Sequence, residues 1–340
     1  MNSCSANSIT GEAVCVDNVT GVYILTSTTL TTTLTSGANG GSSFSGGECE
    51  NCGVAVNAPT GTKGQAAIQM GQAGIPSGSA IQFLDLASNT FGTPIDTQVE
   101  VAEDILWDPF TGYVLTPNEG GVYDLLTITG TGLPCTSGGA TVKEFENGIH
   151  DGEFDSAGED CSTSIALGTI EFTSDLYIAD LKQIKFTAGV PAGTWTAASQ
   201  VQSFPEFGGL AAGTCALAVA PGSSHLGVVG GEFGGNLVGF IQLPSTSGSG
   251  TPSVVDYVVA TMPNSPDGSS FENGYDPHTT TAYTSPNTGK AYAVLADWES
   301  GEPLWLAIVD IKGMLTAPRS GHTVTSIPLG WCATSRRSNR

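Results

Sequence analysis

The sequence has few basic residues and no long hydrophobic run. Only 10 of its 340 residues are Lys or Arg, against 32 Asp and Glu, so the formal net charge at pH 7 is −22. This charge repels the phosphates of nucleic acids and anionic lipid headgroups. A membrane-spanning helix needs a run of about 18 or more apolar residues, which the sequence lacks. We therefore expect neither nucleic acid nor a membrane as a partner.

Charged residues as a whole are also scarce, at 12% of the chain, which leaves little Glu, Lys and Arg for long amphipathic helices. Glycine is abundant instead, with 46 residues, and Ser and Thr fill the segments between short apolar runs. This composition is typical of strands joined by turns. It predicts an all-β fold.

The motifs of several enzyme classes are absent. The chain contains no G-x-S-x-G elbow, no H-E-x-x-H, no Walker loop and no Rossmann fingerprint after a βα unit. One C-x-x-C occurs, at Cys49 and Cys52, but a four-cysteine zinc site needs a second pair of this kind. These absences disfavour a zinc site and the corresponding hydrolases, nucleotidases and dehydrogenases.

Eight cysteines are scattered along the chain, an even number that favours disulfides in an oxidising compartment. They are Cys4, Cys15, Cys49, Cys52, Cys135, Cys161, Cys215 and Cys332. The sequence leaves their pairing open. We expect a secreted protein, extracellular or periplasmic.

A degenerate repeat runs through the chain. Six units, beginning near residues 12, 52, 104, 161, 214 and 275, each combine an apolar strand, a turn and further apolar strands. They recur every roughly 40 to 60 residues, the spacing of four-stranded propeller blades. Turns such as Asp108-Pro-Phe-Thr-Gly112 pair a capping side chain with a residue free to adopt φ > 0. The sequence predicts a six-bladed β-propeller with four-stranded antiparallel blades; a β-sandwich or a β-helix is the alternative.

We expect one propeller domain over residues 1–340. The Thr- and Gly-rich segment 26–47 is interpreted as an outer hairpin or a surface loop, and 333–340 as a disordered tail. The Gly- and Ser-rich segment 245–250 is interpreted as a connector between the fifth and sixth blades.

Polar residues just before the first strand of each blade should converge at one mouth of a propeller tunnel. Carboxylate and amide oxygens from several blades match the coordination of Ca²⁺. The predicted metal ligands are Glu12, Asn51, Asp104, Asp160 and Asn273. The alternative for each of them is a turn cap or a solvent-exposed group.

Three further residues are candidate catalytic groups. His150 lies in an acidic segment, His278 follows Asp276-Pro277, and Glu103 precedes Asp104. A histidine beside carboxylates can act as a general base, and a carboxylate can attack or activate water. For the two histidines, a place in an ordinary surface turn is the alternative.

Two turn sequences, Val16-Asp-Asn-Val-Thr-Gly21 and Trp107-Asp-Pro-Phe-Thr-Gly112, give the chain a blade rhythm that resembles the six-bladed propellers of the gluconolactonase, paraoxonase and diisopropylfluorophosphatase group. The resemblance implies a Ca²⁺-dependent hydrolase of lactones or phosphotriesters. We expect a small-molecule substrate as its partner, and a monomer. The fifth unit departs from this pattern, because it offers only Thr214 at the ligand position. A non-catalytic secreted propeller, serving as a binding or scaffold module, is the second hypothesis.

Overall fold

A computed structural model describes most of the strands. The described residues are 3–7, 9–17, 21–25, 30–34, 53–58, 62–71, 79–97, 104–118, 122–147, 154–170, 173–188, 190–191, 199–204, 217–219, 225–230, 237–248, 250–270, 280–285, 288–297, 304–311 and 328–334. The chain divides into two compact units, 1–155 and 156–340. Each unit is treated by itself below.

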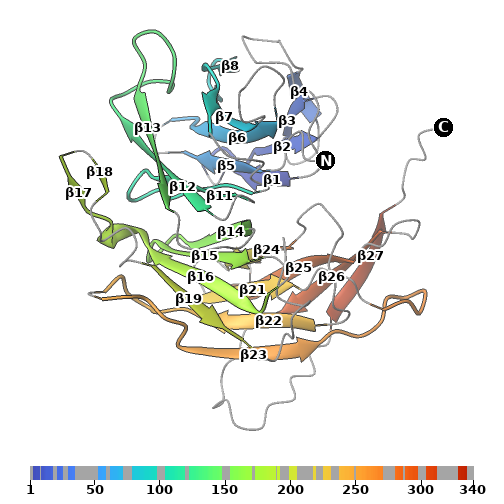
Figure 1. Cartoon of the computed structure of the whole chain (residues 1–340). Helices are drawn as coiled ribbons and strands as arrows, with labels where there is room; N and C mark the ends of the chain where they lie inside the picture. The colour runs from blue at the N-terminus through green and yellow to red at the C-terminus, as the bar shows by residue number, and fades with distance from the viewer. Residues whose placement is uncertain are drawn as a thin grey trace. The chain divides into compact units, whose positions relative to one another are not determined.

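The first unit contains three antiparallel sheets (Figure 1). Sheet 1 is made of β1 (Ser3–Ala6), β2 (Ala13–Asp17), β3 (Gly21–Leu25) and β4 (Leu30–Leu34). Sheet 2 is made of β5 (Val54–Asn57), β6 (Gln65–Gly71), β7 (Ser79–Asp85), β8 (Thr90–Phe91) and β9 (Ile95–Asp96). Sheet 3 is made of β10 (Leu106–Trp107), β11 (Val114–Asn118), β12 (Val122–Thr129) and β13 (Thr141–Asn147).

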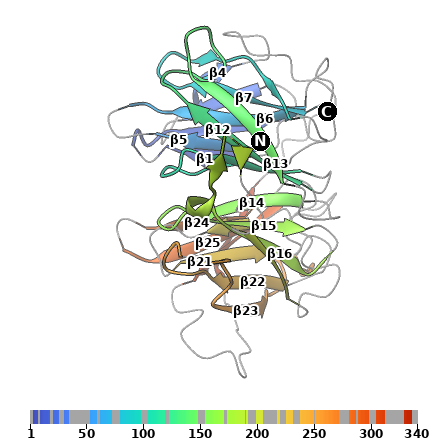
Figure 2. The ribbon, with the colours of Figure 1, turned by 60° about the vertical axis from the view of Figure 1, so that its left-hand side comes forward.

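The second unit has the same construction (Figure 2). Sheet 4 is made of β14 (Phe154–Asp160), β15 (Ile165–Ile170), β16 (Asp175–Asp180) and β19 (Ser199–Ser203). Its last two strands, β16 and β19, are neighbours in the sheet. The chain between them forms the 3₁₀ helix η2 (Leu181–Gln183) and a small hairpin of β17 (Phe186–Thr187) and β18 (Val190–Pro191). Sheet 5 is made of β20 (Leu217–Val219), β21 (Leu226–Gly230), β22 (Leu237–Gln242) and β23 (Asp256–Thr261). Sheet 6 is made of β24 (Thr280–Thr284), β25 (Ala291–Asp297), β26 (Leu304–Asp310) and β27 (Pro328–Thr334).

Sheets pack face to face within each unit, which explains the nearly continuous apolar strands. In sheet 2, Ile68 and Leu84 pack against Val14 of sheet 1. Its opposite face carries Ile81 and Phe83, which belong to the cluster shared with sheet 3. Sheet 5 of the second unit likewise contributes one face to a cluster with sheet 4 and the other face to a cluster with sheet 6. Each central sheet is therefore buried on both faces.

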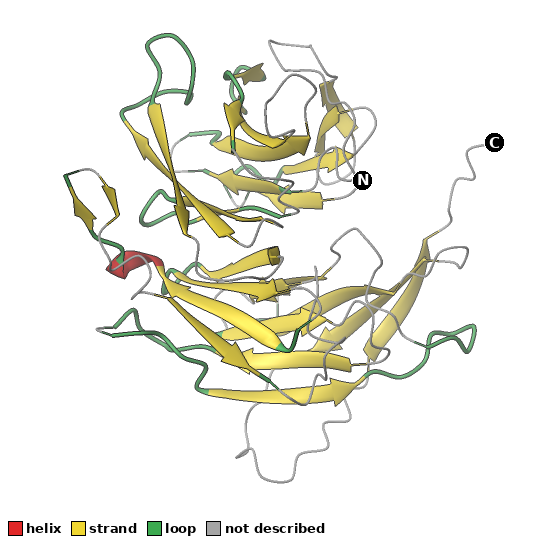
Figure 3. Cartoon of the chain, in the orientation of Figure 1, coloured by secondary structure: helices red, strands yellow, loops and turns green. Residues whose placement is uncertain are grey.

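The all-β prediction is confirmed. In the described residues the only helix is the three-residue η2, and six antiparallel sheets have four or five strands each (Figure 3). None of the described residues forms a helix with the length and hydrophobicity that crossing a membrane requires. The closure of six sheets into a single ring stays a prediction.

The structure bears on three of the segment interpretations. Within 26–47, Leu30–Leu34 is strand β4, which pairs with β3 at the edge of sheet 1, and 26–29 and 35–47 lie outside the described residues. Ala333 and Thr334, assigned to the tail, are the last two residues of β27. The segment 245–250 joins β22 to β23 inside sheet 5, so it does not connect two blades as expected.

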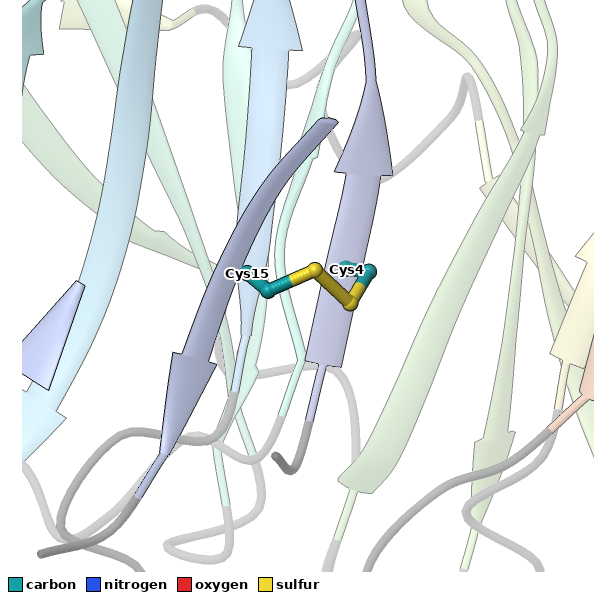
Figure 4. Close-up of a disulfide and its surroundings, with 2 residues drawn as sticks. All are labelled: Cys4 and Cys15. Carbon is teal, nitrogen blue, oxygen red and sulfur yellow. A yellow bond between two sulfur atoms is a disulfide. The ribbon is translucent and has the colours of Figure 1, made fainter. Parts of the chain in front are cut away.

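One disulfide joins Cys4 to Cys15 in the first unit (Figure 4). The two residues lie directly opposite each other on β1 and β2, with a Cα–Cα distance of 4.1 Å. A cross-link between neighbouring strands restricts the unfolded chain. The bond therefore fixes the short strand β1 to the rest of sheet 1.

Removing this bond in Cys4→Ser/Cys15→Ser is expected to lower the free energy of unfolding by about 2 to 3 kcal/mol, because the closed loop is short. Urea denaturation under non-reducing conditions measures the effect. Cys135→Ser is the matched control, since Cys135 forms no disulfide in this structure. Equal midpoints for the double variant and the control would contradict a stabilising role.

Candidate functional site

The turn that joins the first and second strands of a sheet is here named the first turn. In sheet 3 it is Asp108–Gly112, and Asp108 is completely buried. One oxygen of its carboxylate accepts from the Phe110 N–H at 3.0 Å, and the other accepts from the N–H and hydroxyl of Thr111. Gly112 donates to the Asp108 carbonyl with φ +72°. Burial, and then the charge of Asp108, raise the pKa of the neighbouring Tyr113 hydroxyl.

The same first turn recurs in three other sheets. The backbone N–H of the fifth residue donates to the carbonyl of the first in each: Gly11 to Asn7, Ser164 to Asp160 and Gly289 to Ser285. All three donors have positive φ, as Gly112 does. The capped turn with a φ > 0 residue, predicted from the Thr-Gly sequences, is thus confirmed at Asp108–Gly112. Residues 18–20 and 59–61 of two other Thr-Gly sequences lie outside the described residues. Ser164 adopts this backbone conformation without being glycine.

Sheet 4 uses its first-turn cap in a second way. Asp160 ends β14 and is 1% exposed. Its Oδ1 accepts from the Ser162 N–H at 3.0 Å and from the Ser162 hydroxyl at 2.6 Å. Its Oδ2 lies 2.5 Å from Nδ1 of His225, a residue of sheet 5's first turn 65 positions later in the chain. One carboxylate therefore caps its own turn and contacts the neighbouring sheet.

His225 is held in place by its backbone. It precedes β21 with φ +56°, and its carbonyl accepts from the Leu243 N–H and the Gln242 side-chain amide. Its side chain is 27% exposed, whereas that of Asp160 is 2% exposed. We name Asp160, Ser162 and His225 the latch. It joins the first turns of sheets 4 and 5, two sheets that also share an apolar cluster.

The latch contains the residue types of a catalytic triad without its geometry. In a triad, the aspartate and the serine contact opposite nitrogens of the imidazole. Here Ser162 Oγ lies 3.4 Å from Nδ1, the same nitrogen that contacts Asp160. The serine hydroxyl instead donates to Asp160 at 2.6 Å. The contacts thus position Ser162 for turn capping, not for nucleophilic attack.

A second buried carboxylate clamps sheet 4 to the β22–β23 connection. Asp180 ends β16 and is completely buried. It accepts from the Lys182 N–H, the Gln183 side-chain amide, the Ser247 hydroxyl and the Gly248 N–H, at 2.6 to 3.1 Å. Gln183 also exchanges two hydrogen bonds with the backbone of Gly250. We name this group of contacts the clamp.

Three of the predicted metal ligands are described, and they occupy different places in their sheets. Asp104 precedes the first strand of sheet 3, as expected. Glu12 precedes β2, which is the second strand of sheet 1, and Asp160 ends the first strand of sheet 4. The premise that these residues are equivalent therefore does not hold for Glu12 and Asp160.

The local contacts of Glu12 and Asp104 are those of turn residues. Both are half-buried. The Glu12 carbonyl accepts from the Asn7 N–H at 2.7 Å. Asp104 Oδ1 accepts from the Ile105 N–H at 2.8 Å, and the Asp104 carbonyl accepts from the Thr116 hydroxyl.

No group of three or more His, Cys, Asp or Glu side chains that could hold a metal ion occurs in the described part of the chain. The other two predicted ligands and all three candidate catalytic groups lie outside the described residues: Asn51, Asn273, His150, His278 and Glu103. The Ca²⁺ site and these roles stay predictions.

His225 is a residue of the latch for which the sequence predicted no role. A comparison of the first turns, instead of the beginnings of the first strands, would have identified His225. It stands directly before β21, as Ser164 stands directly before β15. Its contact with Asp160 gives that carboxylate a structural role that its sequence position did not indicate.

Comparison with known proteins shows the fold and no family. No family model matches the chain, and no curated protein matches its sequence. The β-propeller domain of Cps50 (Swd1) from Myceliophteria thermophila is similar in structure, with a TM-score of 0.55 and 10% identity over 97% of this chain and 88% of that chain. The chain therefore has a β-propeller fold.

Two structures of the COPII coat are also similar. A chain of the outer coat vertex of COPII on membranes and a chain of the COPII coat assembled on membranes each match 84% of this chain, with TM-scores of 0.50 and 9% identity. This chain spans 65% and 36% of their respective lengths.

These neighbours correct one expectation and leave another without support. The prediction of a small-molecule substrate as the partner is wrong, because the similar structures are a propeller domain and chains of a coat assembly. The resemblance to the gluconolactonase group, with its calcium-dependent hydrolysis, finds no support among them. What the chain shares with these neighbours is the propeller fold.

Proposed function

We propose that this chain is a non-catalytic β-propeller that serves as a binding or scaffold module for another protein. The observation that carries the proposal is the latch. Asp160, a predicted metal ligand, has its two carboxylate oxygens engaged by Ser162 and His225. The histidine and serine beside it join the first turns of two sheets, which is a structural role and not a catalytic one.

The structural neighbours support the same function. Propellers serve both catalysis and binding, so the fold alone does not decide between them. Two of the neighbours, however, are chains of the COPII coat on membranes. A propeller in which the buried carboxylates of Asp160 and Asp180 join neighbouring segments suits a binding or scaffold role.

A secreted location, extracellular or periplasmic, is the second part of the proposal. The Cys4–Cys15 disulfide supports it, since such bonds persist in oxidising compartments.

The proposal predicts no hydrolysis of phosphotriester and lactone panels in the presence of Ca²⁺. The rates with purified protein should equal those of the buffer blank, because the contacts of Ser162 and His225 do not prepare a nucleophile. Ser162→Ala is the matched variant and should behave as the wild-type chain. Hydrolysis that rises in proportion to protein concentration and disappears with EDTA would contradict the proposal and restore the calcium hydrolase hypothesis.

A further inference from the structure

Two exposed apolar side chains occupy the same position of the first turn in two sheets. Ile9 is the third residue of the turn that begins at Asn7, and Phe110 is the third residue of the turn that begins at Asp108. Their exposed fractions are 49% and 65%. Among the described residues, Val255 is the one other large apolar residue with such exposure. Single exposed apolar residues are ordinary, but recurrence at one turn position indicates a shared role.

Both side chains are presented on fixed backbone. The Ile9 N–H donates to Asn7 Oδ1 at 3.0 Å, and the Phe110 N–H donates to Asp108 Oδ1 at the same distance. The two capping side chains are themselves buried. An apolar group held in this way loses little conformational entropy when a partner covers it. Ile9 and Phe110 therefore have the properties of preorganised anchors.

The two anchors belong to the sheets on either side of sheet 2. Strand β5, the first of sheet 2, contacts both β1 and β10, the first strands of sheets 1 and 3. A Cβ atom on Gly53 would lie 2.8 Å from the backbone of Asp104 and Ile105, so sheets 2 and 3 approach closely where β5 and β10 begin. Because first strands in a propeller begin at one end of the blades, the first turns lie at the other end.

The charge of the first unit indicates what kind of surface would cover these anchors. Residues 1–155 contain 17 Asp and Glu but only two basic residues, Lys63 and Lys143, a net charge of −15 out of −22 for the whole chain. A field of this sign attracts positively charged partners and repels acidic ones. The matching surface is basic, with apolar groups to cover Ile9 and Phe110.

We propose that the first turns of the first unit form a docking site for a protein segment in which apolar side chains are flanked by Lys and Arg, anchored on Ile9 and Phe110. This inference rests on the proposed function and specifies its surface and partner. Tight interfaces are commonly centred on apolar or aromatic anchors within a polar rim. The acidic charge sets the rate of encounter and the orientation of the partner.

The test is a selection of phage-displayed random 12-residue peptides against the full chain, followed by affinity measurements on synthetic copies of the enriched peptides. We expect enrichment of apolar residues flanked by Lys and Arg. The variant Ile9→Ser/Phe110→Ser should weaken binding of these peptides by about tenfold or more, as loss of anchors does. Neither substitution alters a capping side chain, and circular dichroism and thermal melting verify that the variant folds.

Val255→Ser is the matched control, because Val255 is 66% exposed but lies in the second unit. It should bind the peptides as the wild-type chain does. Binding that is unchanged in Ile9→Ser/Phe110→Ser would overturn the docking site and leave the binding function intact. The absence of any enriched peptide would count against the site and the proposed function together. Concentration-dependent dimerisation that the double variant abolishes would also overturn the proposal, since the site would then accept a second copy of this chain.

Discussion

Asp180→Ala is expected to lower the free energy of unfolding of the second unit by about 3 to 4 kcal/mol, the largest effect among the substitutions considered. The carboxylate is completely buried and accepts hydrogen bonds from two backbone N–H groups, a hydroxyl and an amide. Alanine would remove four hydrogen bonds to a buried carboxylate at once, which costs more than the loss of a single contact. The clamp would open at the β22–β23 connection.

Two measurements separate this effect from a general loss of stability. Urea denaturation gives the total change, and amide hydrogen exchange reports on the N–H groups of Lys182 and Gly248, which should exchange faster in Asp180→Ala. The matched control is Asp175→Ala, at the other end of β16, where the side chain is half-buried. Unchanged exchange at Gly248 would show that the clamp does not hold the connection.

The fold could be predicted from the sequence because its signals are local. Short apolar runs and Asp- or Asn-initiated turns recur along the chain, and the structure shows why each is needed. Asp108 caps its turn with both carboxylate oxygens, and Gly112 adopts the φ that closes it. Such interactions join residues two to four positions apart, so the pattern is visible without knowing the tertiary structure.

The alignment of the repeats failed where a first strand is not apolar. Strand β1 is only Ser3–Ala6, with alternating half-buried and exposed residues, and β14 contains Asp155, Glu159 and Asp160. Neither has the hydrophobic pattern of a strand, so the first and fourth units predicted from the sequence begin at β2 and β15 instead. That shift of one strand is why Glu12 and Asp160 seemed equivalent to Asp104.

The latch was beyond prediction for a different reason. Asp160 and His225 are 65 residues apart, and their contact depends on how two sheets pack. The sequence predicted that the Asp160 carboxylate binds a ligand, but it did not indicate that His225 is the group in contact with it. A turn cap and a metal ligand use the same side-chain oxygens, and only the position of the donors distinguishes the two roles.

Breaking the latch should have an effect smaller than that of Asp180→Ala and comparable to that of removing the Cys4–Cys15 disulfide. Asp160→Ala removes the cap of the sheet 4 first turn and the buried acceptor of His225, and we expect a loss of about 2 to 3 kcal/mol in the free energy of unfolding. His225→Asn should cost less, since it removes the imidazole but keeps a residue that tolerates positive φ. Urea denaturation of both single variants and of the double variant completes a thermodynamic cycle.

The cycle decides whether the two residues act as a unit. If the Asp160–His225 contact joins sheets 4 and 5, the double variant should lose about 1 kcal/mol less than the sum of the two single variants, because the contact is removed only once. Losses that add to within about 0.3 to 0.5 kcal/mol would mean that Asp160 stabilises its own turn alone. In that case the carboxylate would be a turn cap comparable to Asp108, and the packing of the shared apolar cluster would be sufficient to hold the two sheets together.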